Sequence, residues 1–61
     1  MNELKQFRKD HGLTQEKAAE LLGYNLWSWR SYETGRRDVP LHLLIVIEIY
    51  TDLKGVLNKN T

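Results

Sequence analysis

The sequence contains no cysteine, which excludes disulfide bonds and thiolate metal sites. Its two histidines have no cysteine partners, so we expect no metal ion and no other cofactor. The longest apolar run, LLIVI at 43–47, is far shorter than the roughly 20 residues that a membrane span requires. The polar first ten residues cannot form the apolar core of a signal peptide. We therefore expect a cytoplasmic protein.

An excess of charge of one sign is also absent. Nine Lys and Arg residues face eight Asp and Glu residues, a net charge of +1. Bulk charge therefore does not indicate a nucleic-acid partner, and only the positions of the charges can. The carboxylates are scattered, neither histidine has a metal-ligand partner at i+4, and there is no glycine-rich phosphate loop. We expect that the protein is not an enzyme.

The composition is that of a small globular domain. The chain has 61 residues, of which 41% are hydrophobic and 28% charged. A domain of this length buries only about 60% of the surface that its unfolded chain exposes, so its stability is marginal. Without cysteines, oligomerisation is the remaining common means of stabilisation.

The apolar spacing is helical rather than alternating, which predicts an all-α, compact bundle of four or five short helices. Asn2, Thr14 and Asn25 are favourable N-cap residues. Glycines stand where each of the predicted helices should end. The predicted helices cover residues 2–11, 14–22, 26–34 and 40–53, and end at Gly12, Gly23, Gly35 and Gly55. We expect one domain at 1–55, followed by a short polar tail at 56–61.

Only Gly23 and Tyr24 separate the second predicted helix from the N-cap of the third. Two short helices joined by so tight a glycine turn suggest a helix-turn-helix unit. Ala19 is small enough for the two helices to cross at close range.

The segments LTQEKAAELLG at 13–23 and WRSYETGRRDVP at 29–40 resemble the phage Cro and lambda-type repressor family of helix-turn-helix proteins. The resemblance covers roughly residues 3–50. It rests on Gln15 at a helix start, Ala19, Gly23 and the aromatic-Glu-x-Gly motif at 32–35. It implies a lambda-repressor-like fold in which Trp29 and Tyr32 pack in the core. It also implies that the helix at 26–34 enters the major groove of DNA.

The resemblance assigns base contacts to the positions of Asn25, Leu26, Trp27, Arg30 and Ser31. Leu26 and Trp27 depart from the polar residues that relatives usually carry there. We predict that Trp27 is exposed and contacts a thymine methyl group or the sugar-phosphate wall. The alternative is that its ring covers a neighbouring residue or a partner subunit.

Arg30 on the groove face can donate two hydrogen bonds to guanine, with a phosphate contact or a pair with Glu33 as alternatives. Gln15 at a helix N-terminus can reach a phosphate. The remaining phosphate candidates are basic residues, which could otherwise be solvated charges. They are Arg36 and Arg37 after the helix at 26–34, and, less strongly, Lys17 and Arg8.

The helix at 40–53 is apolar on both sides, and such a helix is normally buried on both sides. A helical wheel places four residues toward the core: Leu43, Val46, Ile47 and Tyr50. It places Leu41, Leu44 and Ile45 on the opposite side. We predict that this second side forms a homodimer interface, with cover by the first helix or by the tail as the alternative.

The sequence thus predicts a sequence-specific DNA-binding transcriptional regulator. We expect a repressor of phage or mobile-element type that binds a palindromic operator as a homodimer. The alternative is an antitoxin-like interaction module, which would bind a partner protein through the apolar face of the helix at 40–53.

Overall fold

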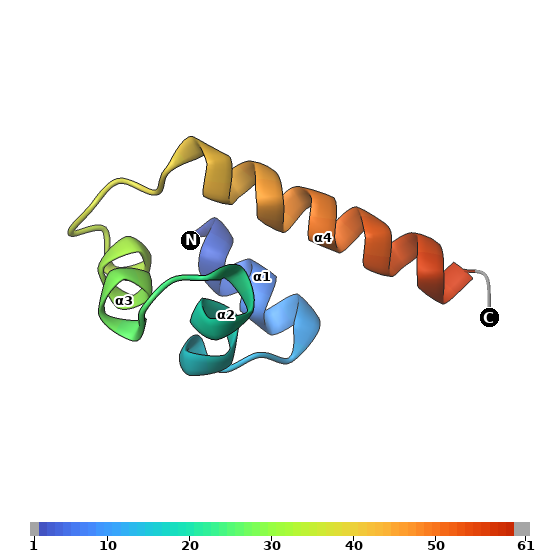
Figure 1. Cartoon of the computed structure of the whole chain (residues 1–61), viewed down its shortest axis with the longest axis horizontal. Helices are drawn as coiled ribbons and strands as arrows, with labels where there is room; N and C mark the ends of the chain where they lie inside the picture. The colour runs from blue at the N-terminus through green and yellow to red at the C-terminus, as the bar shows by residue number, and fades with distance from the viewer. Residues whose placement is uncertain (1, 60–61) are drawn as a thin grey trace.

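The chain folds into four α-helices, seen in a computed structural model that describes the backbone of residues 2–59 and the side chains of residues 2–55. The helices are α1 (Glu3–His11), α2 (Gln15–Leu22), α3 (Leu26–Thr34) and α4 (Leu41–Lys59). The first three form a compact group, and α4 crosses over this group along α1 and extends beyond it (Figure 1). The described backbone contains no strand, which confirms the predicted all-α fold.

The first three helices begin at the predicted N-cap residues. In each case a side-chain oxygen accepts a hydrogen bond from a backbone N–H in the first turn, which would otherwise lack a partner. The pairs are Asn2 with Leu4 at 2.7 Å, Thr14 with Lys17 at 3.1 Å, and Asn25 with Ser28 at 2.7 Å. These helix starts are therefore determined locally.

Gly23 makes the tight turn between α2 and α3. Its φ of 80° lies in the left-handed region, which a side chain would strain. The next N–H, that of Tyr24, donates to the carbonyl of Ala19 at 2.8 Å and closes the end of α2. Because the turn is so short, α3 starts directly beside α2.

Trp29 lies at the centre of the core. Its side chain is completely buried, as are those of Leu4 and Leu43, and Tyr32 is also buried. The core positions predicted for Trp29 and Tyr32 are confirmed. The whole buried apolar cluster joins all four helices and consists of Leu4, Phe7, Ala18, Ala19, Trp29, Tyr32, Leu43 and Ile47.

The predicted end of the last helix is wrong. Helix α4 passes through Gly55 and continues to Lys59, so its final turn takes in residues 56–59 of the predicted tail. Residues 60–61 of that tail lie outside the described residues. A glycine inside a helix costs only about 1 kcal/mol relative to alanine and keeps its backbone hydrogen bond. A glycine therefore does not by itself end a helix, and at Gly55 the chain continues as a helix.

The buried side of α4 also differs from the prediction. Leu44 is half-buried and packs against the core, whereas Val46 is 41% exposed. The reason is that α4 packs mainly against α1, so its buried arc is turned toward Leu44 and away from Val46. Leu41 and Ile45 are exposed, as expected, together with two residues that the wheel did not single out, Ile49 and Leu53.

Four of these residues follow one another at i+4 spacing along the outer side of α4. We call Leu41, Ile45, Ile49 and Leu53 the α4 stripe; their exposed fractions lie between 48% and 72%. Within residues 2–59, none of the helices has the length and apolar character needed to cross a bilayer.

Candidate nucleic-acid interface

A buried carboxylate, that of Glu33, connects the first three helices. One of its oxygens accepts a hydrogen bond from Arg8 Nε at 2.5 Å, and the other accepts from Arg8 Nη2 at 3.0 Å. Gln15 Nε2 donates to it at 3.1 Å, and the indole N–H of Trp29 donates as well. A charge can be buried at this depth only with such partners. Glu33 therefore fixes α1 and α2 against α3.

The partners of Glu33 also determine its protonation. Burial by itself would raise the pKa of this carboxyl. The hydrogen bonds from Arg8, Gln15 and Trp29, together with the charge of Arg8, outweigh burial and lower the pKa below its ordinary value. Glu33 is thus ionised at neutral pH.

This lowered pKa predicts a loss of stability in acid. A group whose pKa is lower in the folded state stabilises the fold fully above its unfolded pKa and progressively less as the pH falls through the folded pKa. We expect Glu33→Gln to be less stable than the parent at neutral pH, because Arg8 loses its partner. The difference should shrink below about pH 4.5, the ordinary value for this carboxyl. Thermal unfolding by circular dichroism at several pH values measures it. A difference that stays constant with pH would contradict the role of this charge.

Gln15 links this buried group to the protein surface. While its amide nitrogen donates to Glu33, its amide oxygen accepts from Nε of the exposed Arg30 at 3.2 Å. The alternative pairing of Arg30 with Glu33 does not occur, because Glu33 is buried and bonded to Arg8. Gln15 therefore holds Arg30, and the phosphate contact expected of Gln15 remains a prediction.

Trp27 is 63% exposed, as predicted from the sequence. The guanidinium of Arg37 lies over its ring, 5.7 Å from the ring centroid, and 5.2 Å from that of Tyr32. Such cation–π contacts orient both partners. The predicted contact of Trp27 with DNA is untested. Of the two residues before it, Asn25 is the N-cap of α3, and Leu26 is half-buried.

Two residues predicted to contact DNA are bonded within the fold, and their DNA contacts remain predictions. Ser31 is only 4% exposed, and its hydroxyl donates to the carbonyl of Trp27 at 3.0 Å. Arg8 donates to Glu33 and, from Nη1, to the carbonyl of Leu13 at 3.3 Å. Ser31 on α3 and Arg8 on α1 thus both make contacts within the fold.

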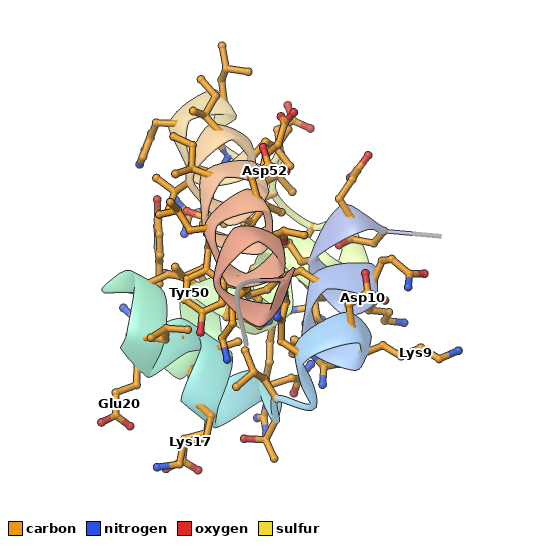
Figure 2. The ribbon with its side chains drawn as sticks, turned by 90° about the vertical axis from the view of Figure 1, so that its right-hand side faces the viewer. Lys9, Asp10, Lys17, Glu20, Tyr50 and Asp52 are labelled. Carbon is orange, nitrogen blue, oxygen red and sulfur yellow. The ribbon has the colours of Figure 1, made fainter. Side chains whose placement is uncertain are left out.

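The remaining basic candidates are exposed. Arg36 and Arg37 lie in the loop after α3, and Lys17 points outward from α2 (Figure 2). A shallow hollow of about 230 Å³ lies beside α3 and is lined by Trp27, Arg30, Ser31, Thr34 and Arg36. The outer side of α3 thus combines one large ring with arginines. No group of three or more metal-ligating side chains gathers in the part of the chain described here.

Sequence reasoning missed the central part played by Glu33. One signal was available: Trp29 and Glu33 are four residues apart, which places them on the same face of a helix. Trp29 was predicted to be buried, so its neighbour on that face was a candidate for burial. The anchoring of Asn2 was also missed; its side-chain nitrogen donates to the carbonyl of Tyr32 at 3.0 Å.

Comparison with known proteins agrees with this geometry. The model of the helix-turn-helix domain family matches residues 2–53, which is most of the chain and includes the α2–turn–α3 unit. No curated protein and no solved structure gives a significant match. Proteins of this kind bind DNA through the second helix of the motif. The chain therefore belongs to the helix-turn-helix domain family of DNA-binding proteins.

Proposed function

We propose that the protein is a sequence-specific transcriptional repressor of the Cro and lambda type, from a phage or mobile element. Its domain, residues 1–55, would place α3 in the major groove and bind a palindromic operator as a homodimer. The observation that carries the proposal is the outer side of α3. There Trp27 and Arg30 are exposed next to Arg36 and Arg37, in a chain whose net charge is only +1.

Arg30 is the best candidate for reading a base. Its Nε is bonded to Gln15, while among the described residues its two Nη nitrogens have no hydrogen-bond partner. Two such nitrogens can donate together to O6 and N7 of guanine. Because Glu33 holds Gln15, and Gln15 holds Arg30, the arginine loses less freedom when it binds.

The α4 stripe supports the homodimer. A single helix-turn-helix unit contacts few base pairs. When a second unit is joined to it by a twofold axis, binding of the second half-site becomes an intramolecular step. Among the predicted interface residues, Leu41 and Ile45 belong to this stripe, whereas Leu44 packs against the core. We therefore place Ile49 and Leu53 in the interface and Leu44 at its edge.

Selection of bound sequences from random duplex DNA tests the proposal. We expect a palindromic site with half-sites about 34 Å, or one helical turn, apart. Enrichment of no sequence would contradict specific binding, and enrichment of a single asymmetric half-site would contradict the homodimer.

Arg30→Ala should weaken binding to the selected site by about 1–3 kcal/mol and relax the preference at one base pair. The reason is the loss of a bidentate contact to guanine. Titration of the selected duplex and of duplexes changed at single base pairs measures both effects.

The matched control is Arg36→Ala with Arg37→Ala. Contacts with phosphates carry no sequence information, so this variant should weaken binding to all duplexes alike. It should also reduce the slope of log K against log salt by about 1 for each lost contact. A uniform loss for Arg30→Ala as well would make Arg30 a phosphate contact.

The exposed α4 stripe also supports a second candidate function, an antitoxin-like module that binds and inhibits another protein. This function requires a stable hetero-complex through α4. Salt-sensitive binding of the lone protein to one DNA site would favour the repressor instead.

A further inference from the structure

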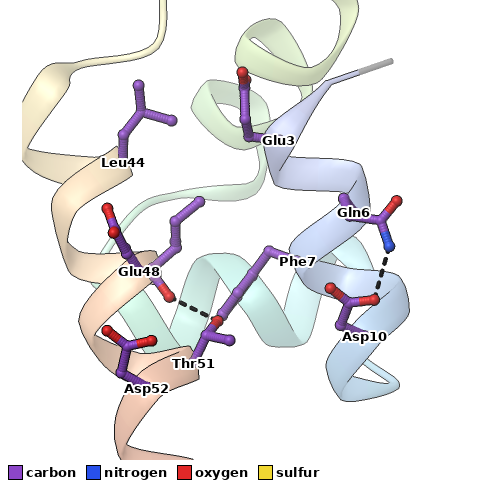
Figure 3. A pocket seen from close by; sticks show the side chains of 9 residues that line it. Glu3, Gln6, Phe7, Asp10, Leu44, Glu48, Thr51 and Asp52 are labelled. Atoms are coloured by element: carbon purple, nitrogen blue, oxygen red, sulfur yellow. Dashed lines mark hydrogen bonds between the residues drawn. The ribbon is translucent and has the colours of Figure 1, made fainter.

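A groove of about 380 Å³ runs between α1 and α4 (Figure 3). Its residues come from these two helices alone, so it is separate from the outer side of α3. The apolar part of its lining consists of Phe7, Leu44 and Ile47. Phe7 and Ile47 belong to the buried core, and half-buried Leu44 packs against this core. The groove therefore exposes the edge of the hydrophobic core.

The rim of this groove is acidic on both sides. Glu3 and Asp10 border it on α1, and Glu48 and Asp52 border it on α4 (Figure 3). All four side chains are exposed, and no Lys or Arg is among the lining residues. Gln6 donates to Asp10 at 2.7 Å, so one carboxylate is also held in place. Four carboxylates around an apolar strip repel DNA and anionic lipid and attract a cationic partner.

The shape of the groove fits a helix. Glu3 and Leu44 lie at one end, and Asp10 and Asp52 lie at the other, so α1 and α4 run side by side in the same direction (Figure 3). At a rise of 1.5 Å per residue, the seven steps from Glu3 to Asp10 span about 10 Å, or two helical turns. A third helix packed along both would present apolar residues every three or four positions.

We propose that this groove binds an amphipathic helix of a partner protein, with apolar residues against Phe7, Leu44 and Ile47 and with Lys or Arg on both flanks. A second copy of this chain fits less well. Its exposed apolar residues on α4 are flanked by Glu48 and Asp52, which would meet the same carboxylates. The proposal does not rest on DNA binding, because the two surfaces have no residue in common.

The test uses the full chain and a synthetic peptide of about 15 Leu and Lys residues, long enough to form a helix. In the probe, the leucines recur at i, i+3, i+4 and i+7. The control peptide has the same composition, scrambled so that no apolar stripe forms. We expect the probe to bind about tenfold more tightly than the control. It should shift the backbone amide resonances of α1 and α4. Equal binding of both peptides, or shifts confined to α2 and α3, would overturn the proposal.

Variants of the rim separate this site from general charge attraction. Glu48→Lys with Asp52→Lys should weaken binding of the probe about tenfold or more, because repulsion replaces attraction. Glu3→Lys with Asp10→Lys, which changes the rim on α1, should weaken binding of the probe to a similar degree. The matched control, Glu16→Lys with Glu20→Lys, makes the same change in net charge at exposed positions of α2 and should leave the affinity nearly unchanged.

If all three variants lost the same affinity for the probe, the net charge alone would explain the loss, and the proposed site would be overturned. A change in the sedimentation of Glu3→Lys with Asp10→Lys without peptide would also overturn it, because these residues lie on α1 and the groove would then be a contact between copies. Failure of the selected-DNA experiment has no bearing on these outcomes, since the peptide assay contains no DNA.

Discussion

Replacing Trp29 by alanine should lower the free energy of unfolding by about 3–5 kcal/mol. The indole is completely buried among residues of the core cluster, and its N–H donates to Glu33. The substitution therefore creates a cavity and also removes one partner of a buried carboxylate. Small domains have only about 5–15 kcal/mol of stability in total. We expect a much lower urea midpoint for the variant, as measured by circular dichroism during urea titration.

Trp27→Ala is the matched control, because it removes the same side chain two residues away on the same helix. Trp27 is 63% exposed, so its loss should change the free energy of unfolding by less than about 1 kcal/mol. It should instead reduce affinity for the selected DNA. If the two variants lost equal stability, the ring of Trp27 would have to pack against the fold more closely than its exposure indicates.

Charging the α4 stripe should abolish tight binding to the operator. In Ile45→Glu with Ile49→Lys, both residues stay exposed in the monomer, and the new i,i+4 pair supports the helix without changing the net charge. In a dimer the same groups would be buried without adequate partners. We expect a folded monomer whose affinity for the palindromic site falls about 100-fold or more, because the second half-site is no longer intramolecular. Sedimentation and DNA titration on one sample measure the change.

A covalent link provides the control for this variant. Two copies of the charged chain joined by a flexible linker should recover part of the lost affinity, since the linker restores a high effective concentration. A parent protein that sediments as a monomer at high concentration would contradict the homodimer. A charged variant that unfolds would show that the stripe is part of the core of the domain.

The sequence by itself determined the starts of the first three helices and the turn between α2 and α3. These features depend on contacts between near neighbours. The side chains of Asn2, Thr14 and Asn25 each accept a hydrogen bond from an N–H two or three residues away. Gly23 adopts the left-handed backbone conformation that the turn requires. The burial of Trp29 and the exposure of Trp27 also followed from the sequence, because the matched family motif places Trp29 in the core and Trp27 on another face of the helix.

Only the tertiary structure decided which polar groups face inward. Arg8 and Glu33 are 25 residues apart, and Gln15 and Glu33 are 18 apart, so no local pattern could pair them. The inward position of Ser31 likewise depends on how α3 is rotated against its neighbours. Ser31 was expected at DNA because the resemblance assigns its position there, and Arg8 because it is basic; in the structure both bond within the fold.

The same reason explains α4. A wheel drawn from the sequence shows that the helix is apolar on both sides, but it does not show which arc meets α1. That contact turns Leu44 inward, leaves Val46 exposed and produces the acidic groove. The continuation of α4 through Gly55 was also beyond the sequence, since a glycine permits a helix to end without requiring it. Local hydrogen bonds are encoded residue by residue, whereas the orientation of a helix depends on the whole packed core.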